Sequence, residues 1–270
     1  CIRDRITPTL NHFDQILCQS QVNYDNFIRL GRKTNGCETS GNLKFDISIT
    51  AELEAKREQL KHVLATDRPI WIAASTHPGD EALALAAFAQ LKQEVADLLM
   101  IIVPRHPERF DEVAELCQSK NYQVARRSHQ ENISSNIEIF LLDSLGELLP
   151  TYAFATVVTM GGSFSEVGGH NPLEPALFKK PVVVGDNMSN FSEILTQMHE
   201  KQAIVQLTKQ ECDLSDDKNS IAIRLATQVL AILNSTELQQ TLGENAFHVV
   251  AQNQGASTRS VKQLKILLEK

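Results

Sequence analysis

The regular alternation of short apolar runs with helical segments from residue 69 onward constrains the fold more than any other feature. Most of the intervening segments have apolar residues spaced by three and four, the period of a helix with one buried side. Continuously apolar strands that alternate with such helices are typical of a parallel sheet covered on both faces. The pattern predicts a doubly wound α/β domain, which binds ligands at the carboxyl ends of its strands. The candidate strands are residues 70–74, 98–103, 122–125, 138–142, 156–160, 182–184 and 203–205.

The segments on either side of this domain also follow a helix and strand pattern. The first 46 residues predict a helix, a strand (14–18), a helix (22–30) and an extended stretch, an α/β piece too small to bury a core by itself. A charged helix at 51–64 leads into the main domain, and a helical tail at 221–270 closes it. The chain begins at Cys1 within what resembles the middle of a domain, so we expect a fragment. The predicted domains are 1–46 and 47–270.

Composition excludes several classes of protein. A net charge of −7 and a pI near 5.6 argue against a nucleic-acid binder. No apolar run approaches the ~20 residues of a membrane-spanning helix. The five cysteines are scattered, without a CxxC or a histidine at metal spacing, which predicts reduced structural thiols and no metal site.

A glycine-rich loop runs from Gly161 to Asn171 and follows the candidate strand 156–160. Asn171 suits a helix N-cap, Pro172 the first helical position and Glu174 the third. Strand, glycine-rich loop and helix N-terminus together present bare backbone donors and a positive dipole end, which favour an anion such as a nucleotide phosphate. The alternative is structural, because glycines also relax tight turns and Glu174 can complete a capping box.

Polar clusters follow three further strands, at residues 75–81, 104–110 and 143–147. Because the carboxyl ends of parallel strands meet at one sheet edge, the four clusters predict one shared site. Arg105 is the best candidate for gripping a phosphate, unless it pairs with Glu108 or Glu112. The clusters predict a site for a nucleotide with few phosphates that works without a metal.

Other polar positions in these clusters have open alternatives. His77 and His106 could donate to a phosphate, or could be cap or surface residues. Asp143 is expected to cap a helix, and Gly146 would allow close backbone approach. Glu147 and Glu174 could accept ribose hydroxyls, or could serve as a cap or lie in solvent. Ser75, Gly162 and Ser163 are further possible site residues.

Taken in order, these clusters resemble the 3-deoxy-D-manno-octulosonic acid (Kdo) transferase family, whose members add Kdo to the lipid A precursor. The residues that carry the resemblance are Gly41-Asn-Leu-Lys-Phe-Asp46, Ser75-Thr-His77, Val103-Pro-Arg-His-Pro-Glu-Arg-Phe110, Asp143-Ser-Leu-Gly-Glu147, Gly161-Gly-Ser163 and Gly168-Gly-His-Asn-Pro-Leu-Glu-Pro175. The resemblance covers residues 41–175 in order and extends weakly toward both ends.

The resemblance implies a two-domain GT-B glycosyltransferase in which the C-terminal domain holds the donor CMP-Kdo, without cofactor or metal and with inversion at the anomeric carbon. It implies that CMP is bound by Pro104, Arg105, Leu145, Gly146, Glu147, Asn171, Pro172, Leu173 and Glu174. It also implies that Lys44 stabilises the transition state, where a cation would offset charge on the departing phosphate. The alternative for Lys44 is a solvated lysine beside Asp46.

The resemblance further implies partners and a location for the full-length protein. These are the lipid A precursor and the membrane surface, both reached through an N-terminal domain at the cytoplasmic face of the inner membrane. The family's general base belongs to a segment that this sequence does not contain, so we expect the chain alone to be inactive. Asp186 and Asn187 stand where the family often has Pro and His, and the cluster after His77 also departs from the usual pattern.

Two other interpretations stay open from the sequence. One is another GT-B sugar-nucleotide enzyme, a UDP-sugar transferase or epimerase, which would need room and charge for two phosphates. The other is a nucleotide-binding module without catalysis. A comparison of CMP with UDP binding separates the first alternative from a Kdo transferase, and activity of the restored full-length protein separates the second.

Overall fold

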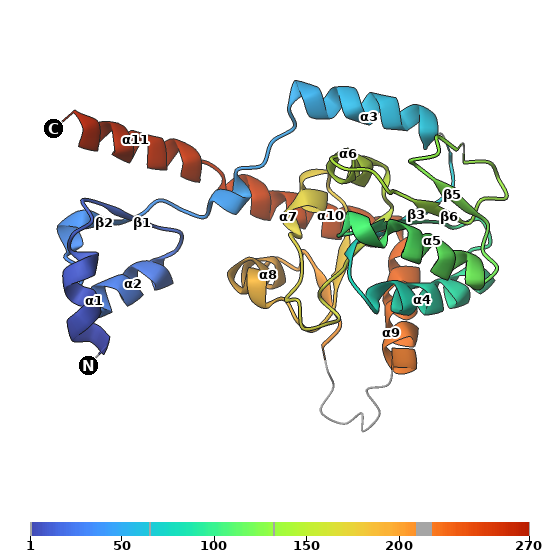
Figure 1. Ribbon diagram of the computed structural model, residues 1–270, viewed down its shortest axis with the longest axis horizontal. Helices are drawn as coiled ribbons and strands as arrows, with labels where there is room; N and C mark the ends of the chain where they lie inside the picture. The colour runs from blue at the N-terminus through green and yellow to red at the C-terminus, as the bar shows by residue number, and fades with distance from the viewer. Residues whose placement is uncertain (1, 65, 132, 209–217, 270) are drawn as a thin grey trace. The chain divides into compact units, whose positions relative to one another are not determined.

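The computed structural model describes residues 2–64, 66–131, 133–208 and 218–269 (Figure 1). Two compact units divide the chain: residues 1–48 with 250–270, and residues 49–249. The last 21 residues thus pack with the N-terminal segment, whereas the sequence analysis places them in the second domain. The assignment of the two predicted domains to acceptor and donor stays a prediction.

The smaller unit contains a two-stranded parallel sheet, the helices α1, α2 and α11, and the last residues of α10. Its elements are α1 (Ile2–Leu10), β1 (Ile16–Cys18), α2 (Gln21–Arg29), η1 (Thr34–Gly36), β2 (Cys37–Thr39), η2 (Leu43–Phe45) and α11 (Ala256–Leu268). Strand β2 lies in the stretch that the sequence analysis left as extended chain. The carboxylate of Asp46 accepts hydrogen bonds from the backbone N–H groups of Gly255, at 2.6 Å, and Ser257, which fixes the start of α11 within this unit.

The larger unit is built on a seven-stranded, wholly parallel sheet with the strand order β5-β6-β4-β3-β7-β8-β9. All seven predicted strands are confirmed, with ends that differ by at most two residues. The strands are β3 (Ile70–Thr76), β4 (Leu99–Pro104), β5 (Val124–Arg126), β6 (Ile139–Leu141), β7 (Val157–Met160), β8 (Val182–Val184) and β9 (Val205–Gln206).

Helices follow most of these strands, as the alternating pattern predicts, and one helix, α3 (Ala51–Val63), precedes β3. The helices after the strands are α4 (Asp80–Glu94), η3 (Pro107–Arg109), α5 (Phe110–Ser119), α6 (Leu148–Thr151), η4 (Tyr152–Phe154), α7 (Leu173–Leu177), η5 (Ser189–Phe191), α8 (Ser192–Glu200), α9 (Lys218–Leu233) and α10 (Thr236–Asn253). Thr50 caps α3 by accepting a hydrogen bond from the N–H of Leu53 at 3.2 Å.

One face of the sheet is covered by α4, α5 and α9, where Trp71, Phe88 and Val229 belong to a continuous buried core. Because side chains alternate along a strand, Ile72 and Phe140 point to the opposite face and are likewise fully buried. Every residue of β3 is buried, which explains the uninterrupted apolar run in the sequence. The doubly wound α/β fold is confirmed.

Two further observations concern the cysteines and the helices of the described residues. Cys18, Cys37 and Cys117 are buried free thiols; Cys1 and Cys212 lie outside the described residues. No helix in the described ranges combines the length and the apolar character needed to cross a bilayer.

Candidate functional site

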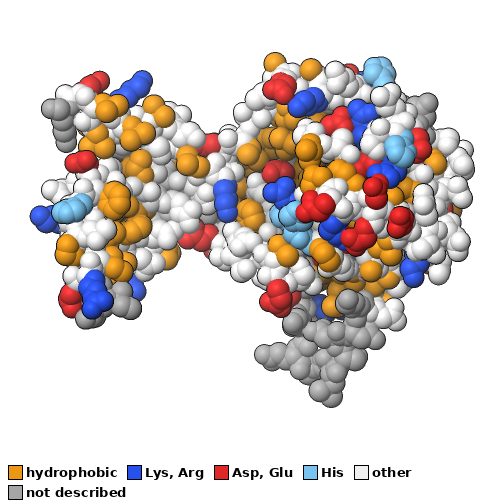
Figure 2. Space-filling view, in the orientation of Figure 1, with side chains coloured by type: hydrophobic (Ala, Val, Ile, Leu, Met, Phe, Trp, Pro, Cys, Tyr) orange, Lys and Arg blue, Asp and Glu red, His pale blue; other side chains and the backbone are white. Residues whose placement is uncertain are grey.

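The four polar clusters follow β6, β4, β3 and β7, which are consecutive neighbours in the sheet. The chain extends the sheet from β3 to β4 on one side and later adds β7 on the other side of β3. The loops after β3 and β7 therefore border the position where the winding reverses, where doubly wound sheets bind ligands. Figure 2 shows acidic, basic and histidine side chains close together on the visible face of this unit.

The ends of β3 and β7 approach closely enough to require glycine. A Cβ on Gly161 would come within 2.5 Å of the carbonyl oxygen of Ser75. Ser75 itself is buried and has a φ of 52°, where the register between β3 and β4 shifts. The Nε1 of Trp71 donates to Oγ1 of Thr159 at 2.9 Å and further joins the two strands. This tight pairing brings the loops after β3 and β7 side by side.

Asp80 ties these two loops together through one oxygen atom. It is the first residue of α4 and is 5% exposed, and its Oδ2 accepts from the N–H of His77 at 2.9 Å and of Gly162 at 2.7 Å. Burial raises the pKa of Asp80, although these two hydrogen bonds oppose the shift. The N–H of Gly162, a predicted site residue, is therefore occupied within the protein.

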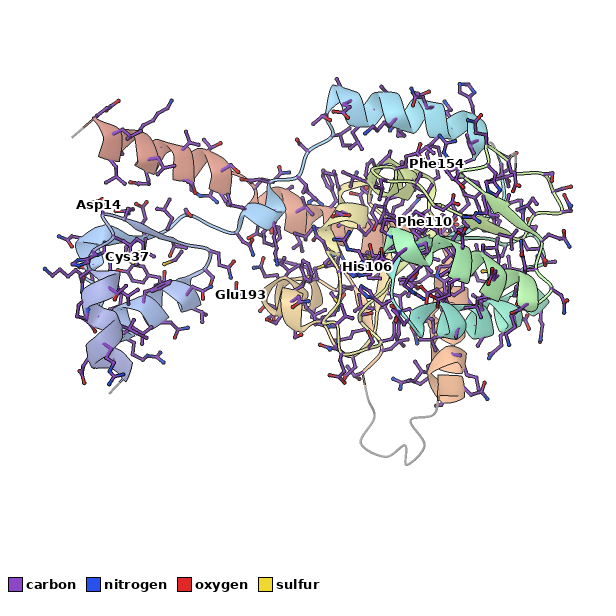
Figure 3. All side chains as sticks on the ribbon, viewed as in Figure 1. Asp14, Cys37, His106, Phe110, Phe154 and Glu193 are labelled. Atoms are coloured by element: carbon purple, nitrogen blue, oxygen red, sulfur yellow. The ribbon has the colours of Figure 1, made fainter. Side chains whose placement is uncertain are left out.

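Three histidines from three loops lie close together beside Asp80. Nε2 of His77, after β3, lies 2.8 Å from Nε2 of His170, in the glycine-rich loop. The ring of His106, after β4, stands edge-on to that of His77, with centroids 5.2 Å apart. Figure 3 labels His106 and Phe110, which mark the loop after β4 and the start of α5. The sequence analysis did not single out His170, because its contact with His77 spans 93 residues.

Arg105 lies next to this cluster with its side chain exposed. Its backbone N–H donates to the carbonyl of Thr76 at 3.0 Å, which anchors the loop to the end of β3. No ion pair joins Arg105 to Glu108 or Glu112, all three of which are described; Glu112 pairs with Arg109 instead, at 3.2 Å. The salt-bridge alternative for Arg105 is thus wrong, and its side chain is exposed to solvent.

Arg109 and Glu81 form a buried ion pair that supports the same loop. Nη1 of Arg109 lies 2.6 Å from Oε1 of Glu81, and Nη2 lies 3.2 Å from Oε2, which is a bidentate geometry. Glu81 is 1% exposed and Arg109 is 9% exposed. The pair fixes η3 to α4 and so holds the loop of Arg105 and His106 in place.

The loop after β6 presents an exposed apolar side chain and a fixed carboxylate. Leu145 is 77% exposed, and Gly146 has a φ of 75° with open space at its Cβ position except for Nζ of Lys56 at 3.8 Å. The carboxylate of Glu147 accepts two hydrogen bonds of 2.9 Å from Arg127 and a further one from Ser144. Burial raises the pKa of Glu147, but these hydrogen bonds outweigh it and lower the pKa.

Asp143, at the start of this loop, does not cap a helix as expected. Its carboxylate accepts from Nε of Arg126 at 2.7 Å and from the backbone and side chain of Ser128, at 2.7 and 2.5 Å. Arg126 is the last residue of β5, the edge strand beside β6, and Ser128 follows that strand. The neighbouring strand and the loop after it thus supply an arginine and a hydroxyl to Asp143, a pairing that the local sequence does not reveal.

The helix after the glycine-rich loop, α7, is five residues long and begins one residue later than expected. Pro172 is its N-cap residue, and Oδ1 of Asn171 accepts from the N–H of Leu173 at 3.2 Å, so Asn171 precedes the cap. So short a helix has a weak dipole, and an anion here depends on side chains more than the sequence analysis expected. Glu174 is mostly buried; burial raises its pKa, and Asn171 and Arg105 oppose that shift.

Several predicted positions have buried side chains and can meet a ligand only through the backbone. These are Pro104, Pro172 and Leu173. Ser163 is wholly buried, and its hydroxyl donates to Met160 O at 2.6 Å and accepts from Gly185 N at 2.8 Å. Lys44 is an exposed residue of η2 in the smaller unit.

A cavity of about 370 Å³ adjoins the glycine-rich loop at the carboxyl ends of β7, β8 and β9. Among the predicted site residues it includes Ser163 alone. Asp186 and Asn187, the residues that depart from the family pattern, also line it. Within the described residues, no group of three or more His, Cys, Asp or Glu side chains has the arrangement of a metal site.

No family model matches the chain. The 3-deoxy-D-manno-octulosonic acid transferase of Haemophilus influenzae is 37% identical over 269 residues, which cover 100% of this chain and 60% of that protein. The enzyme of the same name from Rickettsia felis is 31% identical over 247 residues, which cover 91% of this chain and 50% of that protein. The chain thus spans about half the length of these relatives.

Among solved structures, one resembles the chain in both sequence and fold, and another in fold alone. The C-terminal CMP-Kdo binding domain of WaaA from Acinetobacter baumannii is 34% identical, with a TM-score of 0.65 over 74% of this chain and 99% of that domain. A glycosyltransferase from Rickettsia africae has a TM-score of 0.58 over 99% of this chain and 66% of that protein at 18% identity, which shows the fold alone. The predicted GT-B glycosyltransferase fold is confirmed, and the chain belongs to the 3-deoxy-D-manno-octulosonic acid transferase (WaaA) family, aligning with its C-terminal part.

Proposed function

We propose that this chain binds CMP-Kdo and is the donor-binding part of an enzyme that transfers Kdo to a lipid A precursor. The observation that carries the proposal is the meeting of Arg105, the three histidines and Glu174 at the reversal point of the sheet. The close similarity to a domain described as CMP-Kdo binding supports the choice of ligand.

In this proposal Arg105 binds the single phosphate of the donor. Its guanidinium is exposed and has no ion pair among the described residues, so its planar set of donors is available for two phosphate oxygens. The buried pair of Arg109 with Glu81 holds the loop that carries it. Arg105 therefore binds the phosphate without first having to leave another partner.

The nucleoside lies across the loops after β6 and β7. The exposed side chain of Leu145 supplies an apolar contact for the base, and the open space at Gly146 admits the ligand close to the backbone. Glu174 accepts the ribose hydroxyls through its carboxylate, while Asn171 positions the start of α7. Glu147, held by Arg127, supports the β6 loop.

The transfer itself needs more than this chain. The general base, the lipid A precursor and the membrane surface are assigned to the N-terminal part of the full-length protein, at the cytoplasmic face of the inner membrane. The reaction inverts the anomeric carbon and uses neither metal nor cofactor. Lys44 stabilises the transition state by offsetting the charge that builds on the departing CMP phosphate.

Calorimetric titration of the chain with CMP, UMP, UDP and CMP-Kdo tests the proposal. We expect CMP and CMP-Kdo to bind, and to bind more tightly than UMP and UDP. Tighter binding of UDP would favour a UDP-sugar enzyme instead, because the second phosphate would then have its own contacts. Absence of cytidine nucleotide binding would refute the proposal.

A further inference from the structure

The His77, His106 and His170 cluster is an assembly of nitrogen donors at the place where the loops after β3, β4 and β7 meet. The rings of His77 and His170 are nearly parallel, with an interplanar angle of 10° and centroids 5.0 Å apart. Their Nε2 atoms share one hydrogen bond of 2.8 Å. Within the described residues, neither Nδ1 atom has a hydrogen-bond partner, so both are available to a ligand.

The charges around this cluster are mostly positive. Burial lowers the pKa of His170 to about 4, and the positive charges of His77, Arg105 and His106 add to the effect. Burial also lowers the pKa of His77, with further lowering by His106, Arg109 and Arg105 and an opposing effect of Glu81.

The nearby carboxylates are already engaged inside the protein. Glu81 is held by Arg109, and Asp80 accepts from two backbone N–H groups. The carboxylate of Glu174 accepts from Nδ2 of Asn171 at 3.5 Å, and the charge of Arg105 acts on its pKa without an ion pair between the two. His106 has one further carboxylate beside it, with its Nδ1 3.9 Å from Oε1 of the exposed Glu108. Among the described residues no ion pair joins His77 or His170 to a carboxylate, which gives this pair the electrostatic character of an anion site.

The shared Nε2 contact limits the protons that the pair can hold. One Nε2 carries the bonding proton and the other must be bare, so in the neutral pair one of the two Nδ1 atoms is also bare. A single added proton on that Nδ1 leaves the contact intact and gives the pair one positive charge and two outward N–H donors. A second added proton would place hydrogens on both Nε2 atoms and break the contact.

We propose that His77, His106 and His170 form an oxyanion subsite of the nucleotide-sugar site, and that its occupation brings one proton onto the His77–His170 pair. The inference rests on the proposed function, since it needs an anionic donor molecule at this sheet edge. The oxyanion is either the phosphate or the carboxylate of the acidic sugar. Because a bound anion favours the charged form of the pair, ligand affinity rises as pH falls through neutrality.

The test uses cytidine 5′-(methyl phosphate), a phosphodiester with no group that titrates near neutral pH, beside CMP-Kdo. Titration calorimetry in buffers of different ionisation enthalpy measures proton uptake on binding. At about pH 7 we expect roughly 0.5–1 proton taken up per bound ligand, and about fivefold tighter binding at pH 6 than at pH 8. His170→Gln keeps an amide group near the Nε2 position but removes one of the two titrating rings of the pair, so it should clearly reduce both effects.

His199→Gln is the matched control, because His199 lies at the end of α8 and bonds to Gln206. It should leave uptake and affinity unchanged. His77→Gln should reproduce His170→Gln and replaces it if that variant does not fold, which thermal unfolding reports.

Each outcome has a defined meaning. Uptake with both ligands assigns the subsite to the phosphate, and uptake with CMP-Kdo alone assigns it to the sugar carboxylate. Binding of both ligands without proton uptake, or undiminished uptake by both glutamine variants, overturns the inference and leaves the proposed function standing. Failure of both cytidine ligands to bind overturns the proposed function and the inference together.

Discussion

Oδ2 of Asp80 lies 2.7 Å from the backbone nitrogen of Gly162, so a buried carboxylate at the start of α4 fixes the first turn of the glycine-rich loop. The same oxygen accepts from the N–H of His77. The two loops that border the reversal point of the sheet thus share one acceptor.

Replacing Asp80 by Ala should weaken both stability and CMP binding. It leaves two backbone N–H groups without their acceptor, at a cost of about 1–3 kcal/mol for each that stays buried. Asp80→Asn keeps an acceptor oxygen and should restore most of both properties. Chemical denaturation and CMP titration measure the effects. Equal affinity for CMP in the Asp80→Ala variant would contradict the view that Asp80 holds the loops after β3 and β7 in position for the ligand.

Arg105→Ala should weaken CMP binding by about 1.5–3 kcal/mol, the range for hydrogen bonds to a charged group. The melting temperature should hardly change, because Arg105 is exposed and has no ion pair among the described residues. Arg57→Ala, at a partly buried arginine of α3 that pairs with Glu54 at 2.5 Å, is the control for loss of a positive charge away from the site. CMP binding that matches the unsubstituted chain would remove Arg105 from the site.

Glu174→Gln should weaken CMP binding and leave stability equal or slightly higher at neutral pH. Burial raises the pKa of Glu174, so the folded protein holds its proton to higher pH than the unfolded chain does. The group therefore destabilises the fold as pH rises above its unfolded pKa of ~4.5, and Gln removes that effect. CMP titration and thermal unfolding at several pH values check this. A lower melting temperature with unchanged affinity would assign Glu174 to capping.

Arg127→Ala should destabilise the larger unit by about 1.5–3 kcal/mol at neutral pH, because Glu147 loses two charge-assisted hydrogen bonds. These bonds, working against burial, lower the pKa of Glu147. Their stabilisation is present above the unfolded pKa and lost as pH falls through the folded pKa, so wild type and variant should converge under acid conditions. Denaturant titrations at several pH values measure the convergence. Lys61→Ala, at an exposed pair with Glu58, serves as control and should change little.

This chain alone should show no Kdo transfer to a lipid A precursor, because the proposed base and acceptor surface belong to another part of the protein. General base catalysis contributes roughly 10²–10⁴-fold. In the full-length enzyme, Lys44→Ala should lower turnover far more than CMP affinity, because its charge acts when the phosphate departs. Steady-state kinetics and CMP titration separate the two effects. Kdo transfer by the isolated chain would disprove the assignment of the base and the acceptor surface to another part of the protein. Unchanged turnover of the Lys44→Ala enzyme would show that Lys44 is only a solvated lysine.

The sequence predicts the larger unit well because its strands are continuously buried and therefore leave uninterrupted apolar runs, as at Ile70–Thr76. It also predicts which loops meet, because parallel strands put their carboxyl ends at one edge. It does not predict the partners of those loop residues. The His77–His170 contact and the ion pair of Glu147 with Arg127 depend on which strands become neighbours, and local patterns carry no such information. The sequence also does not show that α7 is only five residues long.

The pairing of β3 with β7 has a consequence for how the protein acquires its site. The N–H of Ile70 bonds to Oγ1 of Thr156, 86 positions later, and the intervening chain contains β4, β5 and β6, which lie on the other side of β3. Contacts so distant in sequence carry a large loop-closure cost and form slowly. Nucleotide binding should therefore return on refolding with the slowest kinetic phase of the larger unit, after much of its helical signal has already recovered.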